Sequence, residues 1–303
     1  MALYVNTNVS SINGRRNLTN ATNNLNTTYQ RLSSGMRINS AKDDAAGLQI
    51  SDRLSSQING LNQGNRNSND GIALAQTAEG AMDEMVTMLQ RIRTLAVQSS
   101  NGTNSQADRD AMQQEVTQLS EEISRIASQT KFGGQQILNG GGNGKMADAN
   151  GHIKLQVGAY SGDSLTLTGF SAGFMVSSIA TLAGIAKNDL EKNGIDTANN
   201  NPARFTVSNQ TAAASAITGV DKLIAAVDKQ RAHLGAMQNR LESTIRNQSN
   251  ISMNVSDARS RIRDTDFAEE SAKLSQQSII QQAASSMLTQ ANARPQIALS
   301  MLG

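Results

Sequence analysis

Apolar residues between positions 75 and 96 recur at alternating spacings of three and four, which is the pattern of a coiled-coil helix. The residues on this seam are Ala75, Ala78, Met82, Met85, Leu89, Ile92 and Ala96. A weaker stretch of the same pattern precedes the seam, so we predict a single helix from about Ala45 to Ser99. Such a helix would run roughly 80 Å at about 1.5 Å per residue, which is far longer than the helices of ordinary globular domains.

A turn ends this helix, because residues 101–108 read NGTNSQAD. The heptad pattern then resumes and stops before Gly133 and Gly134. Its apolar positions are Met112, Val116, Leu119, Ile123 and Ile126. Two long helices joined by a short turn are expected to pack antiparallel.

The C-terminal part of the chain predicts two further helices. Apolar residues from Ala213 to Ile262 keep a three–four spacing, which indicates a third long helix. Residues 264–266 (DTD) supply an N-cap before a fourth segment, Phe267 to Met301, which Pro295 is expected to kink or end. The apolar side of that segment includes Leu274, Ile280 and Met287.

The first forty residues carry an equally thin apolar stripe. Its members include Val5, Val9, Leu18, Leu25 and Leu32. A stripe this thin buries too little area, at about 25 cal/mol per Å², to offset backbone entropy of about 1–2 kcal/mol per residue. We therefore expect the two terminal helices to lie adjacent to each other and to order fully only against neighbouring copies.

The middle of the chain is rich in glycine and predicts the only β-structure. Residues 153–157 and 164–168 alternate apolar and polar side chains, which is typical of a small β-hairpin. The segment 175–209 shows weak periodicity, so we expect it to point outward and to make few buried contacts. The predicted fold class is mainly α, with long antiparallel coiled-coil helices, adjacent terminal helices and a small β-hairpin region.

Composition excludes several classes of function. The net charge is only +2, from 27 basic and 25 acidic residues, which is unlike the concentrated basic face of a nucleic-acid-binding protein. There is no cysteine and there are two histidines, so neither a disulfide framework nor a metal cluster is expected. No segment is apolar and long enough to insert in a membrane, and the N-terminal residues lack the apolar core of a secretory signal.

Three pairs of adjacent carboxylates could be imagined as acid and base: Asp43 with Asp44, Glu121 with Glu122, and Glu269 with Glu270. Adjacent residues on a helix do not face each other, so we interpret these pairs as solvated helix surface. The run GGGNGK, ending at Lys145, lacks the spacing of a phosphate-binding loop. We expect no catalytic, cofactor-binding or metal-binding residue.

Several long segments of the sequence resemble bacterial flagellin. They are MALYVNTNVSSINGRRNLT, LSSGMRINSAKDDAAGLQISDRL, LQRIRTLAVQSSNGT and SMLTQANARPQIALSMLG, within residues 1–140 and 210–303. The resemblance implies an extracellular subunit that polymerises into the helical filament of the bacterial flagellum. It also implies three parts: a terminal inner-tube domain (1–44 plus 265–303), a coiled-coil domain with the hairpin (45–174 plus 210–264), and a short variable outward segment (175–209).

The same resemblance implies partners and a route of export. Family members leave the cell unfolded through the flagellar type III apparatus and meet an export chaperone, a cap protein and hook-junction proteins. Residues 90–98 (QRIRTLAVQ) resemble the segment recognised by an animal Toll-like receptor, which places Arg91, Leu95 and Glu115 at contact positions. Two alternatives remain, a hook–filament junction protein and a soluble helical enzyme.

Overall fold

The computed structural model describes residues 7–142, 145–171, 173–186, 189–196 and 203–300, with side chains described as far as Ala293. The chain forms two compact units, one of residues 1–58 with 251–303 and the other of residues 59–250. The division falls within two long helices, α2 (Ala45–Ser100) and α5 (Gln210–Arg263).

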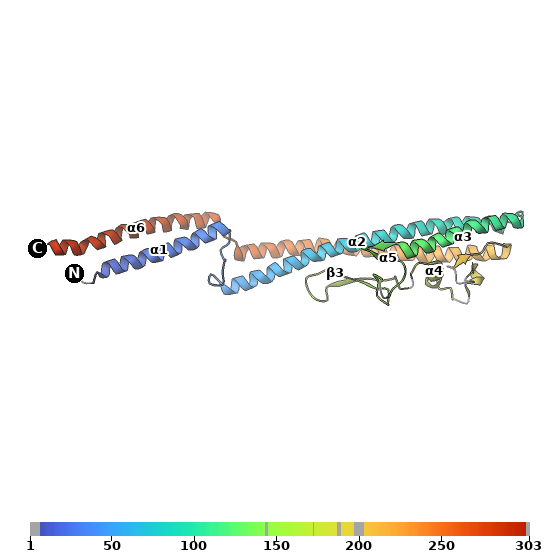
Figure 1. Ribbon diagram of the computed structural model, residues 1–303, viewed down its shortest axis with the longest axis horizontal. Helices are drawn as coiled ribbons and strands as arrows, with labels where there is room; N and C mark the ends of the chain where they lie inside the picture. Colours follow the sequence, from blue (N-terminus) through green and yellow to red (C-terminus); the bar gives the residue numbers. More distant parts are fainter. Residues whose placement is uncertain (1–6, 143–144, 172, 187–188, 197–202, 301–303) are drawn as a thin grey trace. The chain divides into compact units, whose positions relative to one another are not determined.

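The unit of residues 59–250 is built on α2, α3 (Gln106–Gln129) and α5, which lie side by side (Figure 1). Every residue of the predicted seam from Ala75 to Ala96 is buried, which confirms the coiled-coil prediction. The turn before α3 ends in a capping box, in which Ser105 and Asp108 each accept a hydrogen bond from the other's backbone N–H. The helix therefore begins at Gln106, within the segment 101–108 that was predicted as a turn.

Polar contacts fix α5 antiparallel to α2. Arg93 Nε lies 2.6 Å from Asp221 Oδ1, and Arg231 Nη2 lies 2.9 Å from Asp83 Oδ1. Residue numbers rise along one helix as they fall along the other. The third predicted helix is thus confirmed.

In its described residues the glycine-rich middle forms three two-stranded antiparallel sheets. The predicted hairpin is confirmed as β3 (Ile153–Gln156) and β4 (Ser164–Leu167), with Ile153 opposite Leu167. The others pair β1 (Lys131–Phe132) with β2 (Gln135–Gln136), and β5 (Ile195–Asp196) with β6 (Arg204–Phe205). The described residues of this region also form α4 (Val176–Leu182) and the 3-10 helix η2 (Glu191–Asn193).

The expectation that residues 175–209 make few buried contacts is wrong. The described apolar residues of this segment enter the same core as the long helices; they are Val176, Ile179, Ala180, Ile185, Leu190, Ile195, Ala203, Phe205 and Val207. The segment was misjudged because its apolar residues come from short, irregular elements, which have no period to detect.

The terminal unit is built on α1 (Val9–Ser34) and α6 (Phe267–Ser300), which lie side by side and run antiparallel (Figure 1). The predicted cap of α6 is confirmed, since Asp266 Oδ1 accepts hydrogen bonds from the backbone N–H groups of Ala268 and Glu269. The helix does not end at Pro295 but continues to Ser300.

The two chain segments that join α1 to α2 and α5 to α6 are hydrogen-bonded to each other. Met36 and Asp264 form an isolated antiparallel bridge, and the backbone N–H of Thr265 donates to the carbonyl of Gly35 at 3.0 Å. Asp43 Oδ2 accepts from the backbone N–H of Ser40 at 2.9 Å. These hydrogen bonds, with a second one from the backbone of Asn39, hold the pKa of Asp43 below its ordinary value.

Candidate functional site

The terminal apolar stripes line the pair formed by α1 and α6, and most of their members are incompletely covered. Among the predicted assembly residues, Leu25 is buried, and Leu18, Leu32 and Leu274 are partly exposed. Val9, Ile280 and Met287 are exposed, Met287 by 64%. Val5 lies outside the described residues.

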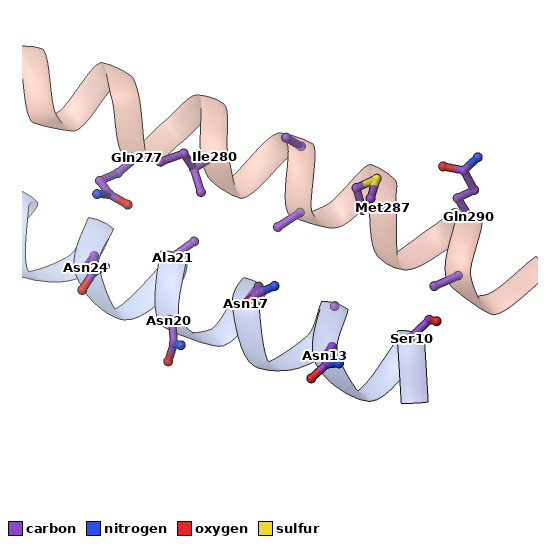
Figure 2. Close-up of a pocket in the computed structure, with 14 residues that line it drawn as sticks. Ser10, Asn13, Asn17, Asn20, Ala21, Asn24, Gln277, Ile280, Met287 and Gln290 are labelled. Carbon is purple, nitrogen blue, oxygen red and sulfur yellow. The ribbon is translucent and has the colours of Figure 1, made fainter. Parts of the chain in front are cut away.

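A groove of about 780 Å³ runs along this helix pair. Its apolar lining is made of small residues and two larger ones: Gly14, Ala21, Ile280, Ala283, Ala284, Met287 and Ala291. Figure 2 shows Ile280 and Ala21 turned toward each other across the groove. The helices pack closely at Gly14, where a Cβ would lie 3.4 Å from Leu288 Cδ1, at the edge of ordinary van der Waals contact.

Amide side chains form the polar rim of the groove. Asn13, Asn17, Asn20 and Asn24 succeed one another along α1 at spacings of four, three and four. Gln277 and Gln290 contribute from α6. Because an amide both donates and accepts, such a rim can pair with amides or backbone groups of an incoming chain.

The sequence analysis missed these asparagines, although their spacing was visible. The period of Asn13, Asn17, Asn20 and Asn24 is that of one helix face. Only apolar periodicity was followed along α1. A polar stripe at the same period beside a thin apolar stripe was the available signal.

Arg31 and Glu270 join the two helices at the end of the pair near the connecting segments. Glu270 is buried, and its carboxylate lies 4.0 Å from Arg31 Nη1 and 3.7 Å from Lys273 Nζ. Its sequence neighbour Glu269 is exposed and pairs with Lys273 at 2.7 Å. The interpretation of this pair as solvated helix surface thus holds for Glu269 and is wrong for Glu270, which is buried between the helices.

The predicted receptor residues lie in the other unit. Arg91 of α2 and Glu115 of α3 are exposed and form an ion pair of 2.7 Å, and the hydrogen bond to the Glu115 carboxylate raises the pKa of Arg91. Leu95, by contrast, is only 3% exposed and belongs to the helical core. The structure thus brings Arg91 and Glu115 together on the surface and leaves Leu95 beneath it.

Within the ranges that the structure describes, no three histidine, cysteine, aspartate or glutamate side chains gather as a metal site. Over the same ranges, no helix has the length and hydropathy needed to cross a membrane.

Comparison with known proteins places both ends of the chain in one family. Residues 5–142 match the bacterial flagellin N-terminal helical region, and residues 217–302 match the bacterial flagellin C-terminal helical region. The chain is 37% identical to polar flagellin F of Vibrio parahaemolyticus, with the whole of both chains covered. It is 42% identical to a flagellin of Halalkalibacterium halodurans, over 99% of this chain and all of that one.

A solved structure of a putative flagellar hook-associated protein from Vibrio parahaemolyticus has a similar fold. Its TM-score is 0.53 at 16% identity, and the match covers 73% of this chain and 100% of that one. That likeness concerns the fold alone. The full-length identity to named flagellins and the two family matches, on a mainly helical chain with paired terminal helices, show that the protein belongs to the bacterial flagellin family, whose members build the extracellular flagellar filament.

Proposed function

We propose that the groove between α1 and α6 is the surface through which copies of this chain join in the flagellar filament. In this proposal residues 1–44 and 265–303 form the inner part of the filament, and the helical bundle surrounds them. The observation that carries the proposal is the exposure of apolar residues on the groove and beside it, above all Met287 at 64% and Ile279 at 68%. Apolar groups left in water on a regular helix face favour association.

Folding and assembly would then be one coupled step. Each residue ordered in α1 and α6 costs roughly 1–2 kcal/mol of backbone entropy, and apolar burial returns about 25 cal/mol per Å². Among the described residues of α1 and α6, the buried apolar side chains are only Ala21, Leu25 and Ala291. In the free subunit these helices are therefore largely unfolded, and neighbouring copies at a growing filament end supply the missing contacts.

Export and capture by other flagellar proteins fit the same surface. A chain whose terminal helices are unfolded can pass through a narrow type III channel without losing a stable core at its ends. An export chaperone would cover the apolar face of α6 before secretion, and cap and hook-junction proteins would contact the same terminal helices at the two ends of the filament.

The test is a charge placed in the groove, with a matched control outside it. Met287→Glu puts a carboxylate among apolar groups, and we expect it to raise the critical concentration for seeded filament growth at least tenfold. Met253→Glu is the control, because Met253 has the same 64% exposure but does not line the groove. Equal inhibition by both variants would contradict the groove as the assembly surface, and wild-type assemblies that stop growing while short would favour the junction-protein alternative.

Recognition by an animal Toll-like receptor is a second proposal, supported by the exposed pair of Arg91 and Glu115. Arginine is a frequent hot-spot residue at interfaces. Arg91→Ala should lower receptor activation by the soluble subunit at least tenfold in reporter cells. Arg93→Ala is the control, because Arg93 lies two residues away and is also paired, to Asp221 at 2.6 Å; equal loss of signalling in the two variants would contradict the assignment.

A further inference from the structure

A proline inside α6 leaves one backbone carbonyl of that helix without its usual donor. In an α-helix each carbonyl accepts a hydrogen bond from the N–H four residues later, and proline has no N–H. Pro295 lies within α6, so the carbonyl that loses its partner is that of Ala291. Ala291 lies largely buried on the groove between α1 and α6.

Asn8, the N-cap residue of α1, supplies the missing donor. Its Nδ2 donates to the Ala291 carbonyl at 2.7 Å. Its Oδ1 meanwhile accepts from the backbone N–H of Ser11 at 3.1 Å, so the same side chain caps the first turn of α1. One residue later along α6, Asn292 Oδ1 accepts from Ser11 Oγ at 2.6 Å.

Proline removes the intrahelical donor at one interior position of α6 only. The other interior carbonyls of α6 are already bonded within the helix, so a side-chain amide gains little by reaching them. Other polar contacts between the described parts of the two helices include a long side chain from at least one helix, as in the 3.3 Å contact of Gln281 with Thr22 and the 4.0 Å contact of Arg31 with Glu270. Long side chains can follow a shift of one helix along the other, whereas a carbonyl exposed by proline is fixed in the chain.

We propose that Asn8 and Pro295 act as a pair that sets the register of α1 along α6. This inference rests on the proposed function of the groove, because a shift of register would misalign the asparagine rim of α1 with the apolar lining from α6. Pro295 leaves the Ala291 carbonyl without a donor inside α6. The Asn8 side chain donates a hydrogen bond to this carbonyl when the two helices are in register. Asn8 is in this sense a positioning residue for assembly.

The register can be read from disulfide cross-links, since the chain contains no cysteine. Ser11→Cys with Asn292→Cys reports the register seen here, and Ser11→Cys with Leu288→Cys reports a shift of one helical turn. Both pairs are introduced into four full-length proteins: the otherwise unchanged chain, Asn8→Ser, Pro295→Ala and the combination. Serine retains the helix cap but is too short to reach Ala291, and alanine restores the N–H that satisfies the Ala291 carbonyl.

The expected result is non-additive. Asn8→Ser and Pro295→Ala each lower the ratio of in-register to shifted product at least fivefold, and the combination lowers it no further, because either change alone already removes the contact. Asn23→Ser is the matched control, an exposed asparagine of α1 outside the groove lining, whose change should leave the ratio within twofold. Independent, multiplicative effects of the two changes would overturn the inference, as would an Asn8→Ser protein that gives neither product, since Asn8 would then be needed for pairing itself.

This experiment separates the inference from the proposed function. Cross-linking is measured in the free subunit and in filaments, so it reports the register wherever the two helices are paired. A chain that shows the coupled effect but forms no filament would contradict the proposed function and leave the register assignment standing. A chain that forms filaments without the coupled effect would contradict the register assignment and leave the proposed function standing.

Discussion

The terminal helix pair and the three-helix bundle follow the same apolar spacing rule and reach opposite degrees of burial. On α2 the whole seam from Ala75 to Ala96 is enclosed, because it shares one core with buried residues of α3, α5 and the described part of 131–209. On α6 the comparable residues Ile280 and Met287 remain exposed, because they line an open groove along α1. An amphipathic stripe therefore indicates that a helix must pack against other elements. How many such elements the chain itself provides decides whether the helix is stable in the free subunit.

Hydrogen exchange tests this difference between the two regions most directly. In the free subunit we expect amides of the α2 seam to exchange on the order of 1000-fold more slowly than amides of α1 and α6, since buried cores open only by global unfolding. In filaments the two sets should become similar. Protected terminal amides in the free subunit would contradict coupled folding and assembly.

Truncation of a side chain should change the free energy of unfolding by very different amounts in the two units. Phe205 is fully buried in the bundle, so Phe205→Ala should lower the free energy of unfolding of the subunit by about 3–5 kcal/mol in a denaturant titration. Met287→Ala should change it by less than about 0.5 kcal/mol, because this side chain is mostly in water. A comparable loss in the two variants would mean that the terminal pair is already part of the folded monomer.

Two glycines of α2 should respond in opposite directions. A Cβ at Gly64 would clash with the carbonyl oxygen of Val157, so Gly64→Ala should destabilise the bundle by about 1–3 kcal/mol. Gly80 has no atom within 4 Å of that position, so Gly80→Ala should stabilise the helix by about 0.5–1 kcal/mol. Thermal unfolding of both variants checks the signs, and a stabilising Gly64→Ala would show that the hairpin does not rest on α2.

The smallest expected effect concerns pH. The pKa of Asp108 is lowered by its hydrogen bonds with Ser105, and that of Asp43 by the backbone of Ser40 and Asn39. A carboxyl whose pKa is lower when folded stabilises the fold above its ordinary value of 3.8, and this contribution is lost as the pH falls through the folded value. NMR titration of the free subunit should show the lowered value for Asp108 and an ordinary one for Asp43, which would shift only on assembly; a lowered Asp43 in the free subunit would place its loop in the folded core.

Much of the fold was predictable because its helices are long and periodic. The seam of α2, the cap at Asp266 and the hairpin of β3 and β4 each carry a local signal, either a spacing or a capping residue. The burial of Phe205 and Ile195 was not predictable, since their strands are two residues long and are held by contacts distant in sequence. The helix continues past Pro295 rather than ending there, and the donor that reaches the Ala291 carbonyl was not predictable for the same reason, because it comes from residue 8.

The sequence by itself determined that the chain forms long helices, that both terminal segments carry only a thin apolar stripe, and which family the chain resembles. These properties follow from local spacing and from residue identity. Only the tertiary structure decided which apolar residues are covered and which polar groups meet. Asn8 and Ala291, or Arg91 and Glu115, are near each other solely because helices fold back on one another. Burial and hydrogen bonding between distant segments depend on that three-dimensional packing, and no pattern confined to one helix encodes them.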